Sequence, residues 1–414
     1  MPFHYIDKRL HVDGVDLSVI AEQFGTPVYV YSEASIRRNA QVIRDTFIQR
    51  GFKVSYAVKA NPNPSILKLL RSFGIGADIV SGGELQMAQH VGFKGSEINF
   101  AGVGKTYTEL ELALNLGIEH FNVESIYELN ELEAKAAELG RSAKVLLRLN
   151  PDIDPQTHPH ISTGLKNNKF GMGPELVTEI LTHTGKYPHL IFDGIHCHIG
   201  SQIVKPQPFY DLIDYLYEYA EDLKKQGVRI EHMDLGGGFG VNYADPFEDI
   251  LDTTPYLEPF AEKAAEKLKQ YQLHIQPGRV LIANSALLLS QVVGTKENGG
   301  HYFVVIDGAT TDLIRPALYD AYHAIYPHIE KPPVRIGDVV GPVCESSDAL
   351  AKQREIPEFE ARELLAIASV GAYGSAMGST YNIRPLSPEV MVNAAGEISQ
   401  IRRRQTFEDL ISLY

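Results

Sequence analysis

The sequence predicts an α/β protein in which an eight-stranded parallel (β/α) barrel is followed by a C-terminal all-β domain. Two observations predict this fold. From about residue 35, short β-rich runs alternate with amphipathic helical stretches, and eight such units follow one another. After residue 280 the runs remain β-rich but helical patterns become scarce. Eight units in series favour a closed barrel over an open sheet.

The barrel strands are expected near residues 53–60, 77–80, 97–101, 119–123, 143–149, 190–197, 230–235 and 273–277. Helices are expected between them, for example at 125–139 and 209–226, where apolar residues recur at helical spacing. We expect the barrel to span 33–278 and the β domain to span 279–414. Residues 1–32 should contribute to the β domain, because GTPVYVYS (25–32) is typical of a strand.

Composition narrows the class of protein. The chain has 414 residues, 44% of them hydrophobic, and a formal net charge of −14. The hydrophobic share supports a large core, and the acidic charge argues against a nucleic-acid partner. The start MPFHYIDKRL lacks the apolar core of a signal peptide, and the longest apolar stretch, 280–293, is too short and polar to span a bilayer. With only Cys197 and Cys344, we expect free thiols and a cytoplasmic protein.

The stretch YAVKAN (56–61) places Lys59 at the end of a predicted strand. Active sites of β/α barrels lie at the carboxyl ends of their strands. A lysine in a partly apolar pocket there can lose its proton and attack a carbonyl carbon. A solvated lysine at a strand end is the commoner interpretation for this position alone, so the other motifs decide.

Glycine-rich motifs follow two predicted strands. Gly236, Gly237 and Gly238 come after the run 230–235, and consecutive glycines let backbone N–H groups converge on a phosphate. A tight glycine turn is the alternative. GVGKT (102–106) looks like a nucleotide-binding P-loop, but that pattern needs a glycine five residues before Gly104, where Asn99 stands.

His196 and His198 flank Cys197 on a predicted strand, so both imidazoles should share one face. This spacing suits a metal, and a metal-dependent barrel hydrolase is therefore a second class of function. Such a site needs further ligands, and among fifteen histidines no second cluster stands at a predicted strand end. Packing in the barrel or stacking on a flat ring is the favoured role for these histidines.

Three more motifs lie beyond the last barrel strand. QPGR (276–279) forms a sharp turn, CESSD (344–348) places a thiol beside a carboxylate, and LIRPALY (313–319) places Arg315 four residues before Tyr319. An arginine at such a site can bind a carboxylate through two hydrogen bonds. A linker turn, a buried inert thiol and a surface ion pair are the respective structural alternatives.

Together and in this order, these motifs resemble the fold-type III pyridoxal-phosphate decarboxylases, which are related to alanine racemase and ornithine decarboxylase. The resemblance covers nearly the whole chain, and its specific stretches are YAVKAN, GADIVSGGEL, GVGKT, FNVES, NPDIDPQTHPHISTG, NKFG, HCHIGSQI, LGGGFG, LIRPALYDAYH, CESSD and GAYG. THPHISTG and LIRPALY favour the diaminopimelate branch over the ornithine branch. The implied reaction converts meso-2,6-diaminopimelate to L-lysine and CO₂.

The resemblance also implies roles for single residues. Lys59 would bond to the aldehyde of pyridoxal 5'-phosphate, His198 would stack on its ring, and Cys344 from a neighbouring subunit would return a proton to the substrate. The other cofactor contacts would come from Ser201, Gly236, Gly237, Gly238, Gln276, Gly278, Arg279 and Tyr373. The substrate contacts would come from Arg279, Arg315, Tyr319, Tyr373 and the neighbour's Glu345. The family works as a homodimer, and no metal is implied.

Two departures from the family pattern affect the expected chemistry. The family has glutamate where this chain has Gln276, so we expect a weaker electron sink and slower decarboxylation. The family run Asp-Ala-Gly-Met-Asn-Asp before its LIRP is here DGATTD (307–312), close to the substrate arginine. A decarboxylase of ornithine, lysine or carboxynorspermidine therefore stays an alternative, and a non-catalytic cofactor carrier is a third class that the full set of substrate residues argues against.

Overall fold

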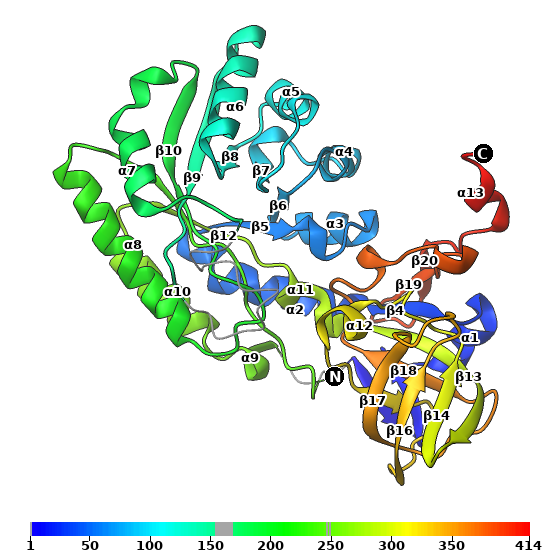
Figure 1. The fold of residues 1–414 in the computed structure, drawn as a ribbon. Helices are drawn as coiled ribbons and strands as arrows, with labels where there is room; N and C mark the ends of the chain where they lie inside the picture. Colours follow the sequence, from blue (N-terminus) through cyan, green and yellow to red (C-terminus); the bar gives the residue numbers. More distant parts are fainter. Residues whose placement is uncertain (1, 154–168, 246, 248–249) are drawn as a thin grey trace. The chain divides into compact units, whose positions relative to one another are not determined.

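The computed structural model describes residues 2–153, 169–245, 247 and 250–414, in two compact units. The barrel unit comprises residues 40–240 and 254–278. The β unit comprises residues 1–39, 241–253 and 279–414. Figure 1 shows helices and strands alternating in the first unit and strands dominating the second.

Eight parallel strands close into a barrel in the order β10-β11-β12-β5-β6-β7-β8-β9, so the predicted fold class is confirmed. Each strand lies within or beside an expected range. Their bounds are β5 Lys53–Ala57, β6 Gly76–Ile79, β7 Ile98–Phe100, β8 His120–Val123, β9 Ala143–Arg148, β10 Leu190–His196, β11 His232–Asp234 and β12 Gln272–Ile275. Most residues of these strands are buried, because both faces of a parallel barrel are covered.

Helix α2 precedes the first barrel strand, and the other helices follow strands; in Figure 1 the helices lie outside the strands. They are α2 Glu33–Thr46, α3 Pro64–Arg71, α4 Gly82–His90, α5 Tyr107–Leu116, α6 Ile126–Leu139, α7 Pro174–Thr182, α8 Gln207–Lys225 and α10 Leu257–Lys267. Ser81, Thr106 and Ser125 cap α4, α5 and α6 through their hydroxyls, each at the loop that follows a strand. Such caps satisfy backbone N–H groups that the first helical turn leaves free.

The β unit is built on a nine-stranded sheet with the main order β17-β16-β14-β13-β4-β19-β20, to which β18 and β15 are added. Their bounds are β4 Val28–Ser32, β13 Ala286–Asn298, β14 His301–Ile306, β15 Ile325–Pro327, β16 Arg335–Val340, β17 Ala349–Ile356, β18 Leu364–Ala368, β19 Glu389–Val392 and β20 Ile398–Arg402. The strand expected at 25–32 is β4, and it pairs with β13 and β19 in this sheet. Residues distant in sequence therefore share one sheet.

A hydrophobic core packs on this sheet. It joins Val28 and Val30 of β4 with Leu287 and Leu289 of β13 and with Leu17, all fully buried. A three-stranded sheet of β1 Phe3–Ile6, β2 Arg9–Val12 and β3 Val15–Asp16 precedes α1 Leu17–Phe24. The remaining helices of the unit are α9 Ile250–Thr253, α11 Arg279–Ile282, α12 Arg315–Tyr319 and α13 Phe407–Ile411. All three helices after residue 278 have five residues or fewer, which agrees with the scarcity of helical pattern there.

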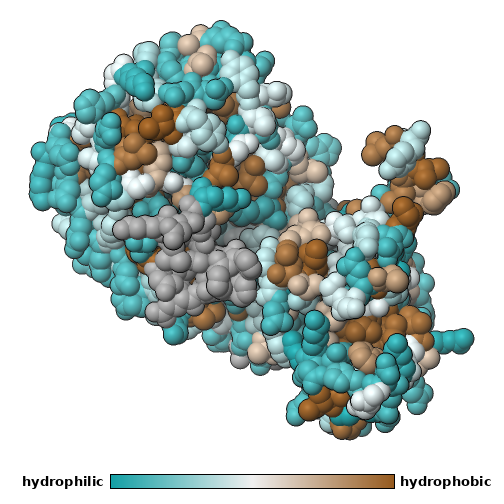
Figure 2. Space-filling model, viewed as in Figure 1, coloured by the Kyte–Doolittle hydropathy of each residue, from teal (hydrophilic) through white to brown (hydrophobic). Residues whose placement is uncertain are grey.

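The surface is largely hydrophilic. Figure 2 shows polar side chains over much of the visible face of the barrel unit, with apolar side chains gathered in separate patches. Within the described residues, no helix has the length and apolarity that crossing a bilayer would require.

Candidate active site

Lys59 stands directly after a barrel strand. β5 ends at Ala57, and a single 3-10 turn, Val58–Ala60, places the lysine side chain outside the core while both of its neighbours are buried. The turn is closed by the Asn61 N–H, which donates to the Val58 carbonyl at 3.0 Å. The strand is therefore shorter than expected, and its end presents the amine at the carboxyl end of the barrel.

Gln276 lies between two buried carboxyl groups. Its Nε2 donates to Oδ1 of Asp78 at 3.1 Å and to Oδ2 of Asp234 at 2.9 Å. Its Oε1 accepts from Nε2 of His196 at 3.1 Å. Burial raises the pKa of Asp78 to about 7, although the positive charge of Lys59 opposes the shift. Burial likewise raises the pKa of Asp234 to about 8.

Asp78 and Asp234 were not among the predicted site residues. A signal was present, because each carboxylate interrupts an apolar strand close to its carboxyl end. Buried carboxyl groups with raised pKa values are typical of functional sites in clefts. The two acids and Gln276 form one polar group at the same end of the barrel as Lys59.

His196 and His198 take different positions. β10 ends at His196, so the expectation that both histidines lie on a strand is wrong for His198. The chain leaves the sheet there, and Nδ1 of His198 accepts a hydrogen bond from the Gly237 N–H at 3.1 Å. Burial lowers the pKa of both histidines well below the usual value, and the charge of Arg148 adds to the effect. Cys197 between them is fully buried.

The three glycines form a turn that side chains would fill. A Cβ on Gly237 would lie 2.1 Å from the Gln276 carbonyl oxygen, and one on Gly238 would lie 2.2 Å from that of Gly200. Gly236 and Gly238 have φ values of 69° and 98°, which favour glycine. The backbone segments that follow β10, β11 and β12 therefore lie very close to one another at this turn. Ser201 is half-buried and Gly278 is buried, both in loops after strands of this set.

The GVGKT lysine has a structural partner. Nζ of Lys105 lies 2.5 Å from Oε1 of Glu128 and donates to the carbonyls of Gly102 and Asn122, and both side chains are 1% exposed. A P-loop lysine must reach a phosphate. Lys105 instead fastens the loop after β7 to α6.

Arg148 is a third residue that sequence reasoning missed. It ends β9, is buried, and pairs with Glu124 at 2.8 Å. Glu124 also accepts from the Gly102 and Gly171 N–H groups, so the pair joins three loops of the barrel. No spacing rule marks this arginine, since its partner lies 24 residues earlier.

Two predicted substrate residues come together in the β unit. Arg279 opens α11 and donates to the Tyr243 hydroxyl at 2.5 Å, while the guanidinium of Arg315 lies 5.1 Å from the centroid of the same ring. Arg315 also donates to Nε2 of His323 at 2.8 Å. Burial raises the pKa of Tyr243, but the two arginines outweigh burial and the net pKa is lowered. Tyr243 had no sequence signal, and the only signal for His323 was its place as the last residue of LIRPALYDAYH.

The aromatic residues expected near the substrate lie in the same unit. The Tyr373 ring centroid is 5.0 Å from the Arg279 guanidinium, and Tyr373 itself has a positive φ of 58°. Tyr319 ends α12 and is half-buried. The run DGATTD is held by its two acids: Asp307 accepts from the Gln291 N–H and Asp312 from the Ala309 N–H. Both aspartates are also in the family pattern, so the departure from that pattern falls on residues 308–311.

Cys344 and Glu345 lie on an exposed loop, so the alternative of a buried Cys344 thiol is wrong. The Cys344 N–H donates to Oδ1 of Asn382 at 3.3 Å, and the Tyr381 hydroxyl donates to Oε1 of Glu345 at 2.7 Å. Asp348 is buried and anchors the loop: its Oδ1 accepts a hydrogen bond from the Thr310 N–H at 2.7 Å. The thiol and carboxylate are thus presented outward from a fixed base.

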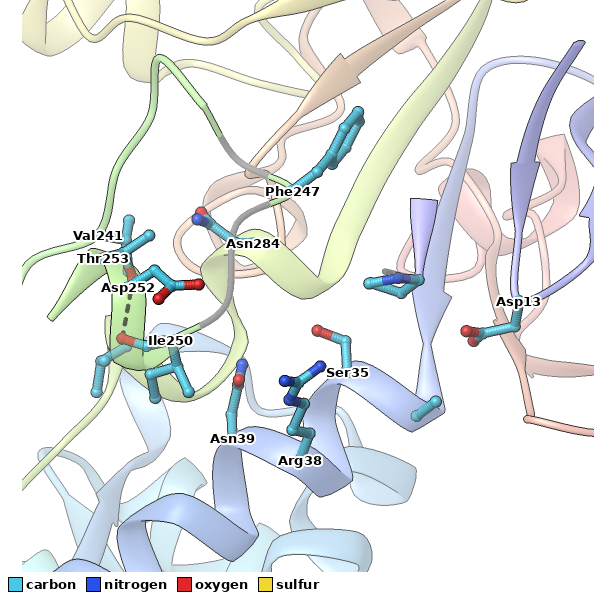
Figure 3. A pocket seen from close by; sticks show the side chains of 13 residues that line it. Asp13, Ser35, Arg38, Asn39, Val241, Phe247, Ile250, Asp252, Thr253 and Asn284 are labelled. Atoms are coloured by element: carbon cyan, nitrogen blue, oxygen red, sulfur yellow. Dashed lines mark hydrogen bonds between the residues drawn. The ribbon is translucent and has the colours of Figure 1, made fainter. Parts of the chain in front are cut away.

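A cavity of about 620 Å³ lies in the β unit. In Figure 3, Ser35, Arg38 and Asn39 project toward it from one helix, and Asp252 and Asn284 lie across from them. None of the predicted site residues lines this cavity. The segment THPHISTG (157–164), which favoured the diaminopimelate branch, lies outside the described residues.

Comparisons with known proteins identify the family of this chain. Residues 33–283 match the family described as "Pyridoxal-dependent decarboxylase, pyridoxal binding domain". Diaminopimelate decarboxylases from Aquifex aeolicus and Haemophilus influenzae are each 41% identical, over 98% and 99% of this chain and 96% and 98% of their own. The crystal structure of diaminopimelate decarboxylase from Helicobacter pylori complexed with L-lysine has a TM-score of 0.89 and 39% identity, covering 96% of this chain and 99% of that chain. The chain therefore belongs to the pyridoxal-dependent decarboxylases, within the group of the diaminopimelate decarboxylases.

Proposed function

We propose that this chain decarboxylates meso-2,6-diaminopimelate to L-lysine and CO₂ with pyridoxal 5'-phosphate. The observation that supports this most directly is the group at the carboxyl end of the barrel, where Lys59, the glycine turn at 236–238 and Gln276 all follow strands. The similar proteins are named diaminopimelate decarboxylases, which supports diaminopimelate as the substrate.

The residues of the barrel fit the cofactor. The glycine turn leaves the space that a Cβ would fill, so its N–H groups can face a phosphate, together with Ser201 and the amides of Gly278 and Arg279. His198 has its Nδ1 held by Gly237, which orients the imidazole to cover one face of a ring. When bound, pyridoxal phosphate supplies an electron sink for the pair left at Cα as CO₂ departs.

Lys59 would hold the cofactor through its amine and release it to the incoming substrate amine. Its neighbours Val58 and Ala60 are buried, so the backbone that carries it is fixed. Asp78 is positioned to interact with this charge, since Lys59 opposes the upward shift of its pKa. Gln276 would face the ring nitrogen with a neutral amide, whereas the glutamate of the family pattern would supply a charge.

In the substrate site, Arg279, Arg315, Tyr319 and Tyr373 would bind the distal carboxylate, and Glu345 the distal ammonium. Diaminopimelate has both groups, whereas ornithine lacks the second carboxylate and would leave an arginine without a partner. A buried unpaired charge costs several kcal/mol, which is enough to discriminate strongly between diaminopimelate and ornithine. Cys344 would donate the proton to Cα from its thiol.

We further propose that the protein works as a cytoplasmic homodimer in which Cys344 and Glu345 serve the neighbour's site. Both residues are exposed on a loop with a fixed base, as a shared site would require. Exposure of a free thiol also suits a reducing compartment.

The test compares the purified protein with Lys59→Ala and with Lys68→Ala, an exposed lysine on α3. We expect visible cofactor absorbance, borohydride-fixed cofactor on the peptide containing Lys59, and lysine as the product from diaminopimelate. Lys59→Ala should lose all three, and Lys68→Ala should retain them. Release of an amine from ornithine or carboxynorspermidine, with no lysine from diaminopimelate, would overturn the substrate assignment.

A further inference from the structure

Three histidines that the sequence scatters over 155 positions meet inside the barrel, at the end opposite Lys59. His120 opens β8, His232 opens β11, and His274 lies in β12. The ring centroid of His120 lies 4.8 Å from that of His232 and 5.5 Å from that of His274. Because β8 is not a neighbour of β11 or β12 in the barrel, these contacts cross its interior. The expectation that no second histidine cluster stands at a strand end is therefore wrong.

One carboxylate borders the cluster. Oδ2 of Asp193 lies 2.9 Å from Nε2 of His120 and 3.6 Å from Nε2 of His232. Nδ1 of His232 and Nε2 of His274 are 2.7 Å apart. A ligand nitrogen from each of the three histidines lies within 4.8 Å of the other two. Ligand atoms around a tetrahedral zinc ion are about 3.3 Å apart, so the side chains are within a small movement of that geometry.

The cluster is chemically unusual for a structural core. His120 and His274 are almost wholly buried, and Nδ1 of each has no hydrogen-bond partner among the described residues. A buried polar atom without a partner is destabilising.

Charges around the cluster allow a cation. The acidic groups that face it are Asp193, Glu119 and Glu231, and the basic groups are Lys53 and Lys144. Lys53 is paired with Glu119, and Lys144 lies 3.5 Å from Asp193. Both lysine side chains are 45% exposed and can turn into solvent. His232 and Asp193 retain some exposure, which leaves an approach from the amino-terminal end.

We propose that His120, His232 and His274 form a binding site for a borderline divalent metal ion, with Zn²⁺ as the ion that this donor set suits best. Three imidazoles match the ligands of zinc and are less suited to magnesium or calcium, which prefer oxygen. Asp193 lies beside the site as the hydrogen-bond partner of His120. The site is on the opposite side of the barrel from Lys59, so its role is to tie β8, β11 and β12 together rather than to act on substrate.

The test uses the cofactor-loaded full chain, stripped of metal by a chelator and titrated with Co²⁺ and Zn²⁺. We expect about one ion per chain and Co²⁺ absorption bands of a tetrahedral site. His120→Gln and His274→Gln should each weaken binding by about tenfold or more. The matched control is His183→Gln, an exposed histidine of the same unit that should bind like the unchanged protein.

X-ray absorption of the unchanged, zinc-loaded protein makes the test independent of whether the variants fold. A first coordination shell that contains three imidazole nitrogens at about 2.0–2.1 Å from the zinc would support the site. Failure to retain Zn²⁺ after gel filtration, sulfur scattering from Cys344, or equal affinity of His274→Gln and the unchanged chain would overturn it.

Discussion

The side-chain amide of Gln276 lies 2.9 Å from the carboxylate of Asp234 and is oriented to donate to it. The same amide donates to Asp78, so a neutral group separates two buried acids at the carboxyl end of the barrel. A glutamate at this position would meet both acids as a third carboxyl group.

Gln276→Glu should therefore have opposite effects on activity and stability. We expect turnover of diaminopimelate to rise, because a carboxylate facing the ring nitrogen strengthens the electron sink. The cofactor-free protein should lose about 1–3 kcal/mol of unfolding free energy at pH 8, because two buried carboxylates lose their donor. Steady-state kinetics and urea unfolding measure the two effects, with the exposed Gln23→Glu as the charge-matched control. An unchanged or lower turnover would contradict the weaker-sink hypothesis.

Asp78→Asn should flatten the pH dependence of stability. Burial raises the pKa of Asp78 to about 7 in the folded chain, above its value in the unfolded chain. The folded state thus binds more protons than the unfolded state between about pH 4 and pH 7, and stability falls as pH rises through that window, by at most about 1.4 kcal/mol per pH unit. Urea unfolding of the cofactor-free protein at pH 5 and pH 8 measures this slope.

The slope should decrease in Asp78→Asn and stay the same in Asp222→Asn, which changes an exposed aspartate. If both variants keep the slope of the unchanged chain, the Asp78 carboxyl does not titrate in this window.

Glu128→Gln tests the buried pair with Lys105. Removing one charge leaves the Lys105 ammonium uncompensated inside the protein, so we expect a loss of about 3–5 kcal/mol of unfolding free energy. Because the pair is structural, neither the unchanged chain nor the variant should bind a nucleoside triphosphate. Urea unfolding and calorimetric titration with ATP measure these outcomes, and the exposed Glu218→Gln is the control. ATP binding that Glu128→Gln abolishes would restore the P-loop interpretation.

Tyr243→Phe tests the arginine cluster of the β unit. The change removes the hydroxyl that accepts from Arg279 while keeping the ring beside Arg315. We expect the KM for diaminopimelate to rise about tenfold, equivalent to about 1.4 kcal/mol, with a smaller change in kcat. Tyr322→Phe, an exposed tyrosine of the same unit, should have no effect. A fall in kcat alone would place Tyr243 in the chemical step instead.

Mixing two inactive variants tests the shared site. Lys59→Ala and Cys344→Ser should each be inactive alone. In the proposed twofold dimer, each active site takes its lysine from one chain and its thiol from the other. Random reassembly of equal amounts should then restore about a quarter of the normal activity, because about half of the dimers are mixed and each mixed dimer has one intact site. Refolding or subunit exchange followed by a lysine assay measures it. Absence of recovery, with heterodimers shown by mass spectrometry, would mean that both residues serve one chain's own site.

Most of the barrel could be predicted because each strand is an apolar run between helices, and eight repeats fix the closure. The glycine turn was also predictable, since only glycine fits where three loops approach so closely. Asp78, Asp234 and Arg148 could have been found as charges inside apolar strands. Tyr243 could not, because its contact with Arg279 joins positions 36 residues apart that no periodicity relates.

The histidine cluster shows a further limit of sequence reading. His120, His232 and His274 stand in different β-α units, and only barrel closure brings β8 across the interior from β11 and β12. Spacing along the chain cannot report contacts that form through the centre of a closed sheet.

The turn at 236–238 also constrains how this protein can change. A methyl group on Gly237 would collide with the backbone of Gln276 rather than with a side chain, so no compensating substitution nearby can make room. In a library that samples every amino acid at this position, only glycine should survive selection for growth. Altered substrate preference must then arise through the arginine cluster and its loops, where side chains meet side chains.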